Sequence, residues 1–291
     1  MTIKFLAATT AVLVLLLHCV AFGSRAFDCS YDSNQQYGPS SFETMDVYRA
    51  SGQNRPAIVI IHGGGWAGGD KAGHDFYAKQ FLKKGITVFN INYRLITAGK
   101  PDTVWPAQIQ DVQHVVRLIR ANAAKCGIDP TRICAMGDSA GGHLAMMLGT
   151  LNKSWPGDRS KLYAEQSPAV SCVVDLFGPT DLANPNFNKG GTALLGLFGG
   201  KSVAQAPELY SQASPINHVR SASATTLILH GNNDQIVPVA QATDFASALK
   251  AKGVPHQIFV FNGRHWEFDP PSLKNQIDAY IVEWVRQFLK P

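Results

Sequence analysis

Continuous apolar runs, bounded by polar residues and glycines, recur along the chain and predict buried strands. A run that is apolar at every position is typical of a strand covered on both faces of a sheet. The segment 42–48 instead alternates between apolar and polar residues, and it too predicts a strand. The other predicted strands span residues 57–61, 86–91, 133–136, 171–177, 226–230 and 257–261.

Segments with apolar residues at helical spacing lie between these strands. They span residues 75–84, 108–126, 142–151, 244–252 and 276–289. Strands that alternate with helices predict a mostly parallel sheet with helices on both faces. Residues 24–41 are polar and rich in turn formers, which predicts an extension lying on the surface. The sequence therefore predicts one α/β domain over residues 27–291, preceded by a separate segment at residues 1–26.

The first 26 residues have the pattern of a secretory signal peptide. Lys4 supplies a positive charge, residues 5–17 form an apolar core, and Ala21-Phe22-Gly23 offers a small-residue cleavage pattern. The core is shorter than the roughly 20 residues that a membrane span needs, although a retained anchor is the alternative. The sequence therefore predicts a secreted or periplasmic protein, and it leaves open which of the two.

Charge and composition argue against nucleic-acid binding and leave other classes of function open. The chain of 291 residues has 45% apolar residues, 16% charged residues and a formal net charge of +5. No basic cluster interleaved with aromatic residues is present in the sequence, so nucleic-acid binding is not indicated. The composition is that of an ordinary globular domain.

Four cysteines would remain after removal of the signal peptide. An even number in an oxidising compartment permits disulfides. Cys29 and Cys126 lie in polar, loop-like surroundings and are candidates for a pair. Cys134 and Cys172 lie in apolar strand-like runs, where a buried free thiol is a common outcome. The pairing itself is not fixed by the sequence, and none of the spacings resembles a zinc site.

The motif Gly-Asp-Ser-Ala-Gly-Gly at residues 137–142 carries the strongest chemical signal. It follows the strand predicted at 133–136 and precedes the helix predicted at 142–151. A Gly-x-Ser-x-Gly motif between a strand and a helix is typical of a nucleophile elbow, a tight turn that lifts a serine above the sheet. Glycine and serine are common residues, so Ser139 becomes a candidate nucleophile only if suitable partners occur elsewhere.

A glycine-rich loop, His62-Gly63-Gly64-Gly65-Trp66, directly follows the strand predicted at 57–61. Glycines allow backbone N–H groups to turn into a cavity, where they can form an oxyanion hole. The loop lacks the Lys-Ser/Thr ending of a phosphate-binding loop and the spacing of a dinucleotide fingerprint, and a plain tight turn is the remaining alternative. Beside the serine motif, it makes Gly64, Gly65 and Ala140 the candidate oxyanion donors.

The candidate acid is Asp234, which follows the strand predicted at 226–230. It would then lie at the same sheet edge as Ser139. The alternatives are that Asp234 only forms a turn or caps a helix, and that Asp175, at the end of another strand, is the acid.

The candidate base is His265, in the loop after the last predicted strand. From there a histidine can reach back over the sheet edge to Ser139. The other histidines have structural explanations. His143 is expected to point into helix packing, His62 and His230 to bond neighbouring loops, and the segments around His74, His114, His218 and His256 look exposed.

The order Ser139, Asp234, His265 resembles that of the α/β-hydrolase superfamily of serine esterases. His-Gly-Gly-Gly with Gly-Asp-Ser-Ala-Gly-Gly is similar to the hormone-sensitive-lipase-like branch. Gly-Gly-Gly-Trp-x-x-Gly-Asp, with Asn92-Tyr93-Arg94 and Ile128-Asp129-Pro130, is more similar to the compact feruloyl- and acetyl-esterase-like branch. The resemblance covers the whole mature length. It implies an α/β-hydrolase fold, a Ser-His-Asp triad and ester hydrolysis without a cofactor or metal.

The chain departs from related esterases in two places. Trp266 follows the candidate base where relatives usually have glycine, and it could line the acyl pocket. Trp266 and Trp66, the latter in the glycine loop, are the candidate substrate contacts. The N-terminal extension is too short for the helical cap of hormone-sensitive-lipase relatives, which implies a small cap or none. The segment 183–216 is the candidate for a partial lid or an acyl-pocket wall, with ordinary helix packing as the alternative.

These features predict a serine carboxylesterase that acts through an acyl-enzyme on a small-molecule or carrier-bound ester. Two alternatives stay open. One is an amidase similar to arylformamidases or small peptidases, and the other is a non-catalytic binding module on a hydrolase scaffold. The sequence does not identify the ester or the oligomeric state.

Overall fold

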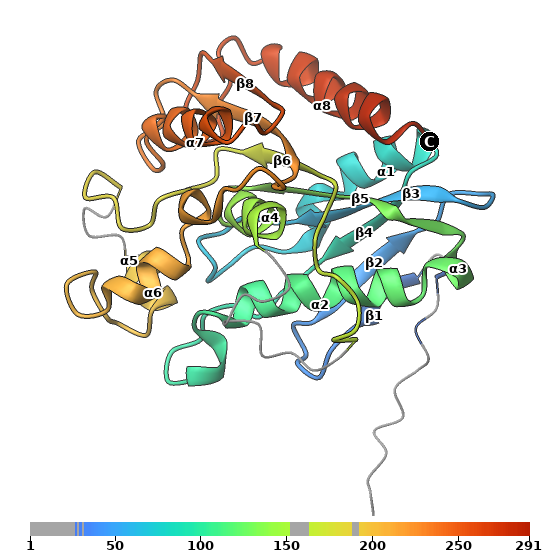
Figure 1. Ribbon diagram of the computed structural model, residues 1–291, viewed down its shortest axis with the longest axis horizontal. Coiled ribbons are helices and arrows are strands. Elements are labelled where there is room, and N and C mark those ends of the chain that lie inside the picture. Colours follow the sequence, from blue (N-terminus) through green and yellow to red (C-terminus); the bar gives the residue numbers. More distant parts are fainter. Residues whose placement is uncertain (1–26, 28, 31, 152–162, 188–191) are drawn as a thin grey trace, which may run out of the picture.

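A computed structural model describes residues 27, 29–30, 32–151, 163–187 and 192–291 (Figure 1). The predicted signal peptide at residues 1–26 lies outside the described residues. Within the described ranges, no helix has the length and apolar character needed to cross a membrane.

Eight strands form one mixed sheet in the order β1-β2-β4-β3-β5-β6-β7-β8. The strand β2 runs antiparallel to both β1 and β4, and all other neighbours are parallel. This is the mostly parallel α/β-hydrolase architecture that the sequence predicts. The strands are β1 (Asp32–Gln36), β2 (Thr44–Tyr48), β3 (Arg55–Ile61), β4 (Thr87–Ile91), β5 (Ile128–Asp138), β6 (Cys172–Leu176), β7 (Thr225–Gly231) and β8 (His256–Phe261).

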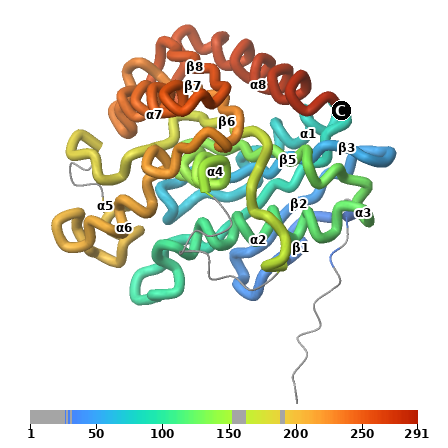
Figure 2. The backbone as a smooth tube through the Cα atoms, in the orientation of Figure 1, coloured from blue at the N-terminus to red at the C-terminus, as the bar shows by residue number. Residues whose placement is uncertain are grey.

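Helices cover both faces of the sheet (Figure 2). Alternate residues of each buried strand enter two separate apolar cores, because successive side chains of a strand point to opposite faces. One core contains residues of α2, α4 and α7, and the other contains residues of α1 and α8. The helices are α1 (Asp75–Lys83), α2 (Ala107–Ala121), α3 (Ala123–Cys126), α4 (Ala140–Thr150), α5 (Thr192–Leu197), α6 (Pro207–Gln212), α7 (Ala240–Ala251) and α8 (Leu273–Leu289), with short 3-10 turns η1 (Lys71–His74), η2 (Pro101–Thr103) and η3 (Pro215–His218).

Two predicted segments differ from the structure for local reasons. The expected surface extension contains β1, which pairs with β2 although it is mostly polar. An edge strand needs no apolar pattern, so hydrophobic periodicity does not detect it. The helix predicted over 108–126 is divided at Asn122, whose side chain donates to the Leu118 carbonyl oxygen at 2.8 Å. Side-chain bonds of this kind compete with the helical backbone.

Both pairs of mature cysteines form disulfides. Cys29 pairs with Cys126, as the sequence suggested, with Cα atoms 5.2 Å apart. Cys134 pairs with Cys172, so the expectation that these two remain free thiols is wrong. The two residues are directly opposite on neighbouring strands β5 and β6, with Cα atoms 4.6 Å apart, which lies within the range that a disulfide bridges. The apolar runs around Cys134 and Cys172 predict burial, but they do not predict that the two residues lie opposite each other.

A buried acidic cluster joins the loop before β2 to α2. Glu43 and Asp111 are 4% and 1% exposed, and Arg94 donates to both oxygens of Asp111. Glu43 accepts the Ser40 N–H at 2.6 Å. Burial, followed by the charge of Asp111, raises the pKa of Glu43 to about 7. Glu43 is therefore protonated in the folded protein below neutral pH.

This cluster predicts a loss of stability as the pH rises from about 4.5 to about 7. The folded pKa of Glu43 lies above its ordinary value of 4.5, so its stabilising contribution is complete below that value and is lost as the pH rises through about 7. We expect the melting temperature of the wild type to fall by roughly 5 °C more than that of Glu43→Gln between about pH 6 and pH 8.5. Thermal unfolding of both proteins checks this, and parallel pH curves would contradict it.

Candidate active site

Ser139 lies in a strained turn between β5 and α4. Its φ angle is 51°, in a region that residues other than glycine rarely adopt. Two hydrogen bonds hold this conformation. The Ser139 N–H donates to the Leu176 carbonyl oxygen at 2.8 Å, and the Ser139 carbonyl oxygen accepts the His143 N–H at 2.9 Å. The turn has the geometry that the Gly-x-Ser-x-Gly motif predicts.

The glycines of the motif are required by close backbone approach. A Cβ atom on Gly141 would lie 2.0 Å from the carbonyl oxygen of Ile61 at the end of β3. A Cβ atom on Gly137 would lie 2.3 Å from the Gly141 carbonyl oxygen. The first turn of α4 therefore packs directly on the sheet, and this contact brings Ser139 close to the glycine loop that follows β3.

The structure brings Ser139, His265 and Asp234 into one hydrogen-bonded line. His265 Nε2 lies 2.9 Å from Ser139 Oγ, and His265 Nδ1 lies 2.5 Å from Asp234 Oδ2. The three side chains come from the ends of β5, β7 and β8, at one edge of the parallel sheet. Their exposed fractions are 9%, 3% and 6%, respectively, so water screens their charges only weakly.

Asp234 is held in its ionised form. Its Oδ1 atom accepts the N–H groups of Ile236 and Val237 at 2.8 and 2.9 Å. Burial alone would raise the pKa of Asp234, but hydrogen bonds from His230 and His265 outweigh it and keep that pKa well below the ordinary value. An ionised carboxylate at this position fixes the His265 tautomer with its proton on Nδ1.

His230 bonds a neighbouring loop, as the sequence predicts, but its contact with Asp234 was not predicted. Its Nε2 atom lies 2.8 Å from the Val237 carbonyl oxygen and 3.3 Å from Asp234 Oδ2. His230 therefore contacts both the carboxylate and the loop that carries it. The available signal was a histidine at the end of β7, four residues before the candidate acid.

Asp175, the rival acid, lies in a different environment. It is fully buried on β6 directly opposite Gly137, and burial raises its pKa well above the ordinary value. Its Oδ1 atom accepts the Gly178 N–H at 2.9 Å. A protonated carboxyl cannot stabilise an imidazolium as a carboxylate does, so this geometry favours Asp234 as the acid.

The backbone around Gly64 and Gly65 is arranged for donation. Their φ angles are 108° and 60°, and a Cβ atom on Gly64 would lie 2.2 Å from the Gly68 carbonyl oxygen. Within the described part of the chain, neither of their N–H groups donates to a backbone carbonyl. The Ala140 N–H opens α4 and has no acceptor within the helix. These three N–H groups therefore remain candidate donors to an oxyanion.

Trp66, the last residue of the glycine loop, is buried in the packed core. It is 3% exposed, and its indole N–H donates to His143 Nδ1 at 3.2 Å. His143 Nε2 in turn donates to the Ala213 carbonyl oxygen at 2.6 Å. Burial lowers the pKa of His143 to about 4, which keeps the ring neutral and able to accept this bond. His143 thus points into helix packing, as expected, and its bond to Trp66 anchors the end of the glycine loop in the core.

Trp266 has the opposite setting, on the rim of the site. It is 51% exposed and packs edge-on against Phe177 and His265, with ring centroids 4.9 and 4.8 Å apart. A Cβ atom on Gly63 would lie 3.1 Å from the far edge of the Trp266 ring. The indole therefore lies between the candidate base and the glycine loop, and about half of the residue is exposed to solvent.

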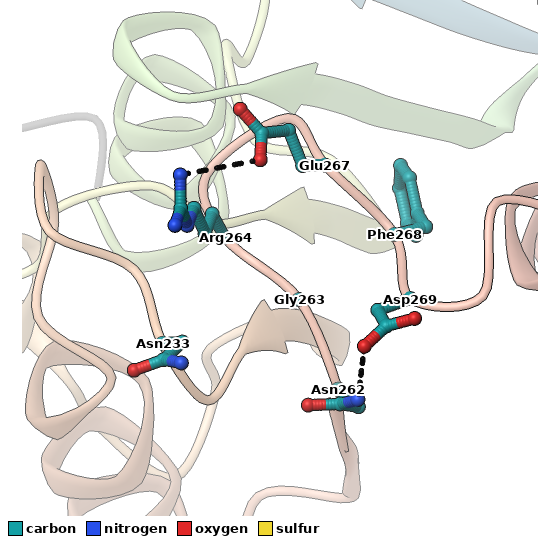
Figure 3. Close-up of a pocket in the computed structure, with 7 residues that line it drawn as sticks. All are labelled: Asn233, Asn262, Gly263, Arg264, Glu267, Phe268 and Asp269. Atoms are coloured by element: carbon teal, nitrogen blue, oxygen red, sulfur yellow. Dashed lines mark hydrogen bonds and ion pairs between the residues drawn. The ribbon is translucent and has the colours of Figure 1, made fainter.

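The loop that carries His265 is braced by its own contacts (Figure 3). The Arg264 guanidinium pairs with the Glu267 carboxylate at 3.5 Å, and the Asn262 side-chain amide donates to Asp269 at 3.0 Å. The backbone N–H of Arg264 also donates to the Glu267 carbonyl oxygen at 2.8 Å. A pocket of about 320 Å³ lies against this loop, and its lining does not include Ser139, Asp234 or His265. Its lining residues are Asn233, Asn262, Gly263, Arg264, Glu267, Phe268 and Asp269.

The described part of the segment 183–216 forms short helices. Leu194 and Leu197 of α5 are buried in the main core. A Cβ atom on Gly65 would lie 3.3 Å from the Ala193 side chain, so α5 begins beside the glycine loop. The predicted acyl-pocket wall therefore has core packing on one side and the candidate oxyanion donors on the other.

Comparisons with known proteins point to one family. The BD-FAE family model matches residues 45–249. The protein named Esterase LipQ of Mycobacterium tuberculosis is 31% identical over 76% of this chain and 53% of its own length. The chain thus spans about half the length of the curated relatives it matches.

Two solved structures resemble the chain over most of its length. A truncated carbohydrate esterase from gut microbiota has a TM-score of 0.78 and 28% identity, covering 91% of this chain and 99% of that one. The acetyl ester-xyloside bifunctional hydrolase of Caldicellulosiruptor lactoaceticus has a TM-score of 0.69 and 29% identity, covering 85% and 86%.

Proposed function

The chain belongs to the BD-FAE family of α/β-hydrolase serine esterases, and we propose that it hydrolyses carboxylic esters through Ser139, His265 and Asp234. The observation that carries this proposal is the hydrogen-bonded line from Ser139 Oγ through the His265 ring to Asp234, with distances of 2.9 and 2.5 Å. The esterase names of the relatives support the reaction type.

Acylation follows from this geometry. His265 Nε2 removes the proton from Ser139 Oγ as Oγ attacks the ester carbonyl carbon. Asp234 stabilises the resulting imidazolium, and the new charge on the carbonyl oxygen is held by the N–H groups of Gly64, Gly65 and Ala140. Each such donor contributes roughly 3 kcal/mol in comparable sites. The alcohol then leaves with the proton that His265 has taken.

Deacylation reverses the roles of the same groups. Water enters in place of the alcohol, His265 removes one of its protons, and the hydroxide oxygen attacks the acyl carbonyl carbon. The tetrahedral intermediate uses the same three N–H donors. Its collapse releases the carboxylic acid and returns the proton from His265 to Ser139 Oγ.

We further propose short-acyl or aromatic esters on bulky carriers as substrates. The names of two structural neighbours support this class, because they describe a carbohydrate esterase and an acetyl ester-xyloside hydrolase. The half-exposed indole of Trp266 at the rim supports it as well, since an open aromatic face suits an aromatic acyl group or a sugar ring.

Replacing Trp266 by alanine should separate aromatic from small substrates. Lost ring contacts of about 1 kcal/mol would raise KM for an aryl-acyl ester roughly fivefold. We expect KM for the corresponding acetate to change less than twofold. Steady-state kinetics with both esters measure the effect, with Phe288→Ala on α8 as a surface aromatic control. Equal changes for the two esters would argue against a substrate contact by Trp266.

We also propose that the protein is exported. The pattern of residues 1–26 supports this, and so do the two disulfides, because disulfides persist in oxidising compartments.

An ester and its matched amide distinguish the proposed esterase from an amidase. The wild type should cleave p-nitrophenyl acetate with kcat/KM at least about a thousandfold above that for p-nitroacetanilide or an aryl formamide. A higher kcat/KM for either amide would replace the esterase proposal by the amidase alternative. Absence of turnover on the whole panel would favour a binding module.

A further inference from the structure

The buried carboxylate of Asp138, beside the candidate nucleophile, contacts both ends of the segment 63–74, which contains the glycine loop and η1. Asp138 directly precedes Ser139, and its side chain is 6% exposed. Its Oδ1 atom accepts the Gly63 N–H at 3.0 Å and lies 2.7 Å from His74 Nε2. Gly63 is the first glycine of the glycine loop, and His74 is the last residue of η1, the 3-10 turn that follows the loop. One oxygen atom therefore joins the two ends of this segment to the nucleophile turn.

In the contact between His74 and Asp138, the imidazole is the hydrogen-bond donor and the carboxylate is the acceptor. A carboxylate oxygen only accepts hydrogen bonds, so His74 Nε2 carries the proton that it shares with Asp138. Bonds of this charge-assisted kind are stronger than neutral ones, and burial strengthens them further. Loss of the imidazole would leave the Asp138 carboxylate with one donor fewer, free to rotate away from Gly63.

The 3-10 turn that presents His74 is itself fixed. Asp70 caps it by accepting the Ala72 N–H at 2.8 Å. The buried Lys71 ammonium contacts Asn34 at 2.8 Å and Asp46 at 3.1 Å, which anchors the turn to β1 and β2. His74 is thus held by the edge of the sheet, and it can set the position of Asp138.

Gly63 is next to the candidate oxyanion donors. A rotation of its peptide moves the N–H groups of Gly64 and Gly65, because successive peptides share backbone atoms. A Cβ atom on Gly63 would lie 2.5 Å from Asp138 Oδ2, so the loop and the carboxylate are in direct contact. The position of Asp138 therefore affects the geometry of the oxyanion hole.

We propose that His74 is a positioning residue for the oxyanion hole, acting through Asp138 and the Gly63 N–H. The inference rests on the proposed esterase function. Misplaced donors weaken the binding of charge that develops only in the transition state, so the loss appears in kcat with little change in KM.

A pair of variants tests the hydrogen bond itself. His74→Leu removes the donor at similar volume, and His74→Gln places an amide N–H near the position of Nε2. We expect His74→Leu to lower kcat on an aryl ester by about tenfold or more, with KM changed less than about twofold. His74→Gln should keep kcat within about threefold of the wild type. His256→Leu, at the amino end of β8, is the matched control and should retain kcat.

A thionoester separates the oxyanion hole from a general structural effect. Its carbonyl oxygen is replaced by sulfur, which oxyanion donors hold poorly. His74→Leu should therefore lose more activity on the ester than on the thionoester, while its melting temperature stays close to that of the control. If His74→Leu does not fold, His74→Ala with and without added imidazole gives the same comparison.

The outcomes are distinct. Wild-type kcat in His74→Leu, or equal losses on ester and thionoester, would overturn the role of His74 while leaving the esterase intact. A wild type that cleaves neither substrate would instead contradict the proposed function.

Discussion

Replacing Ser139 by alanine should lower kcat for ester hydrolysis by about five to six orders of magnitude, and also removing His265 should lower it no further. The reason is that the two side chains act as one unit. Without Oγ there is no acyl-enzyme, so the base at 2.9 Å has no proton to remove. Steady-state kinetics on one aryl ester with Ser139→Ala, His265→Ala and the double variant measure the coupling.

The residual rate carries information as well. Correctly placed oxyanion donors should leave the double variant above the uncatalysed reaction by about a thousandfold, because the N–H groups of Gly64, Gly65 and Ala140 remain. Additive losses in the double variant would mean that Ser139 and His265 contribute separately. That result would contradict the hydrogen-bonded mechanism.

Conversion to asparagine should abolish most of the activity at Asp234 and have little effect at Asp175. Asp234→Asn should lower kcat by about ten thousandfold, because an amide at this position favours the wrong tautomer of His265. Asp175→Asn should keep kcat within about threefold, because burial raises the pKa of Asp175 and the native carboxyl is already neutral. Asp175→Asn is thus the control for Asp234→Asn, because it makes the same chemical change at a second buried aspartate.

Kinetics on one aryl ester, with melting temperatures for both variants, make the comparison. A folded Asp175→Asn protein that has lost activity, beside an active Asp234→Asn protein, would transfer the acid role to β6.

The parts of the site that could be predicted from the sequence are those that lie at the ends of apolar runs. An apolar run that predicts a strand precedes each of them: the glycine loop, Ser139, Asp234 and His265. Parallel strands bring their carboxyl ends to one edge, so chain order and element type were enough to group them.

The rest depends on contacts that local pattern does not encode. The Cys134–Cys172 disulfide requires the register of β5 against β6, and β1 is a polar strand held by its neighbour. His74 lies in a segment that looks exposed, and only the fold shows its contact with Asp138. His230 likewise resembles any histidine at the end of a strand until Asp234 is placed beside it.

Covalent labelling of Ser139 by a fluorophosphonate tests the account most directly. The reagent phosphonylates a serine only when a base and an oxyanion hole activate it. Labelling therefore tests the triad and the glycine loop together. Intact-mass and peptide mass spectrometry should find one adduct, on the peptide that contains Ser139, and Ser139→Ala should abolish it. An unlabelled wild type, or an adduct that survives Ser139→Ala, would contradict the assignment of Ser139 as the nucleophile.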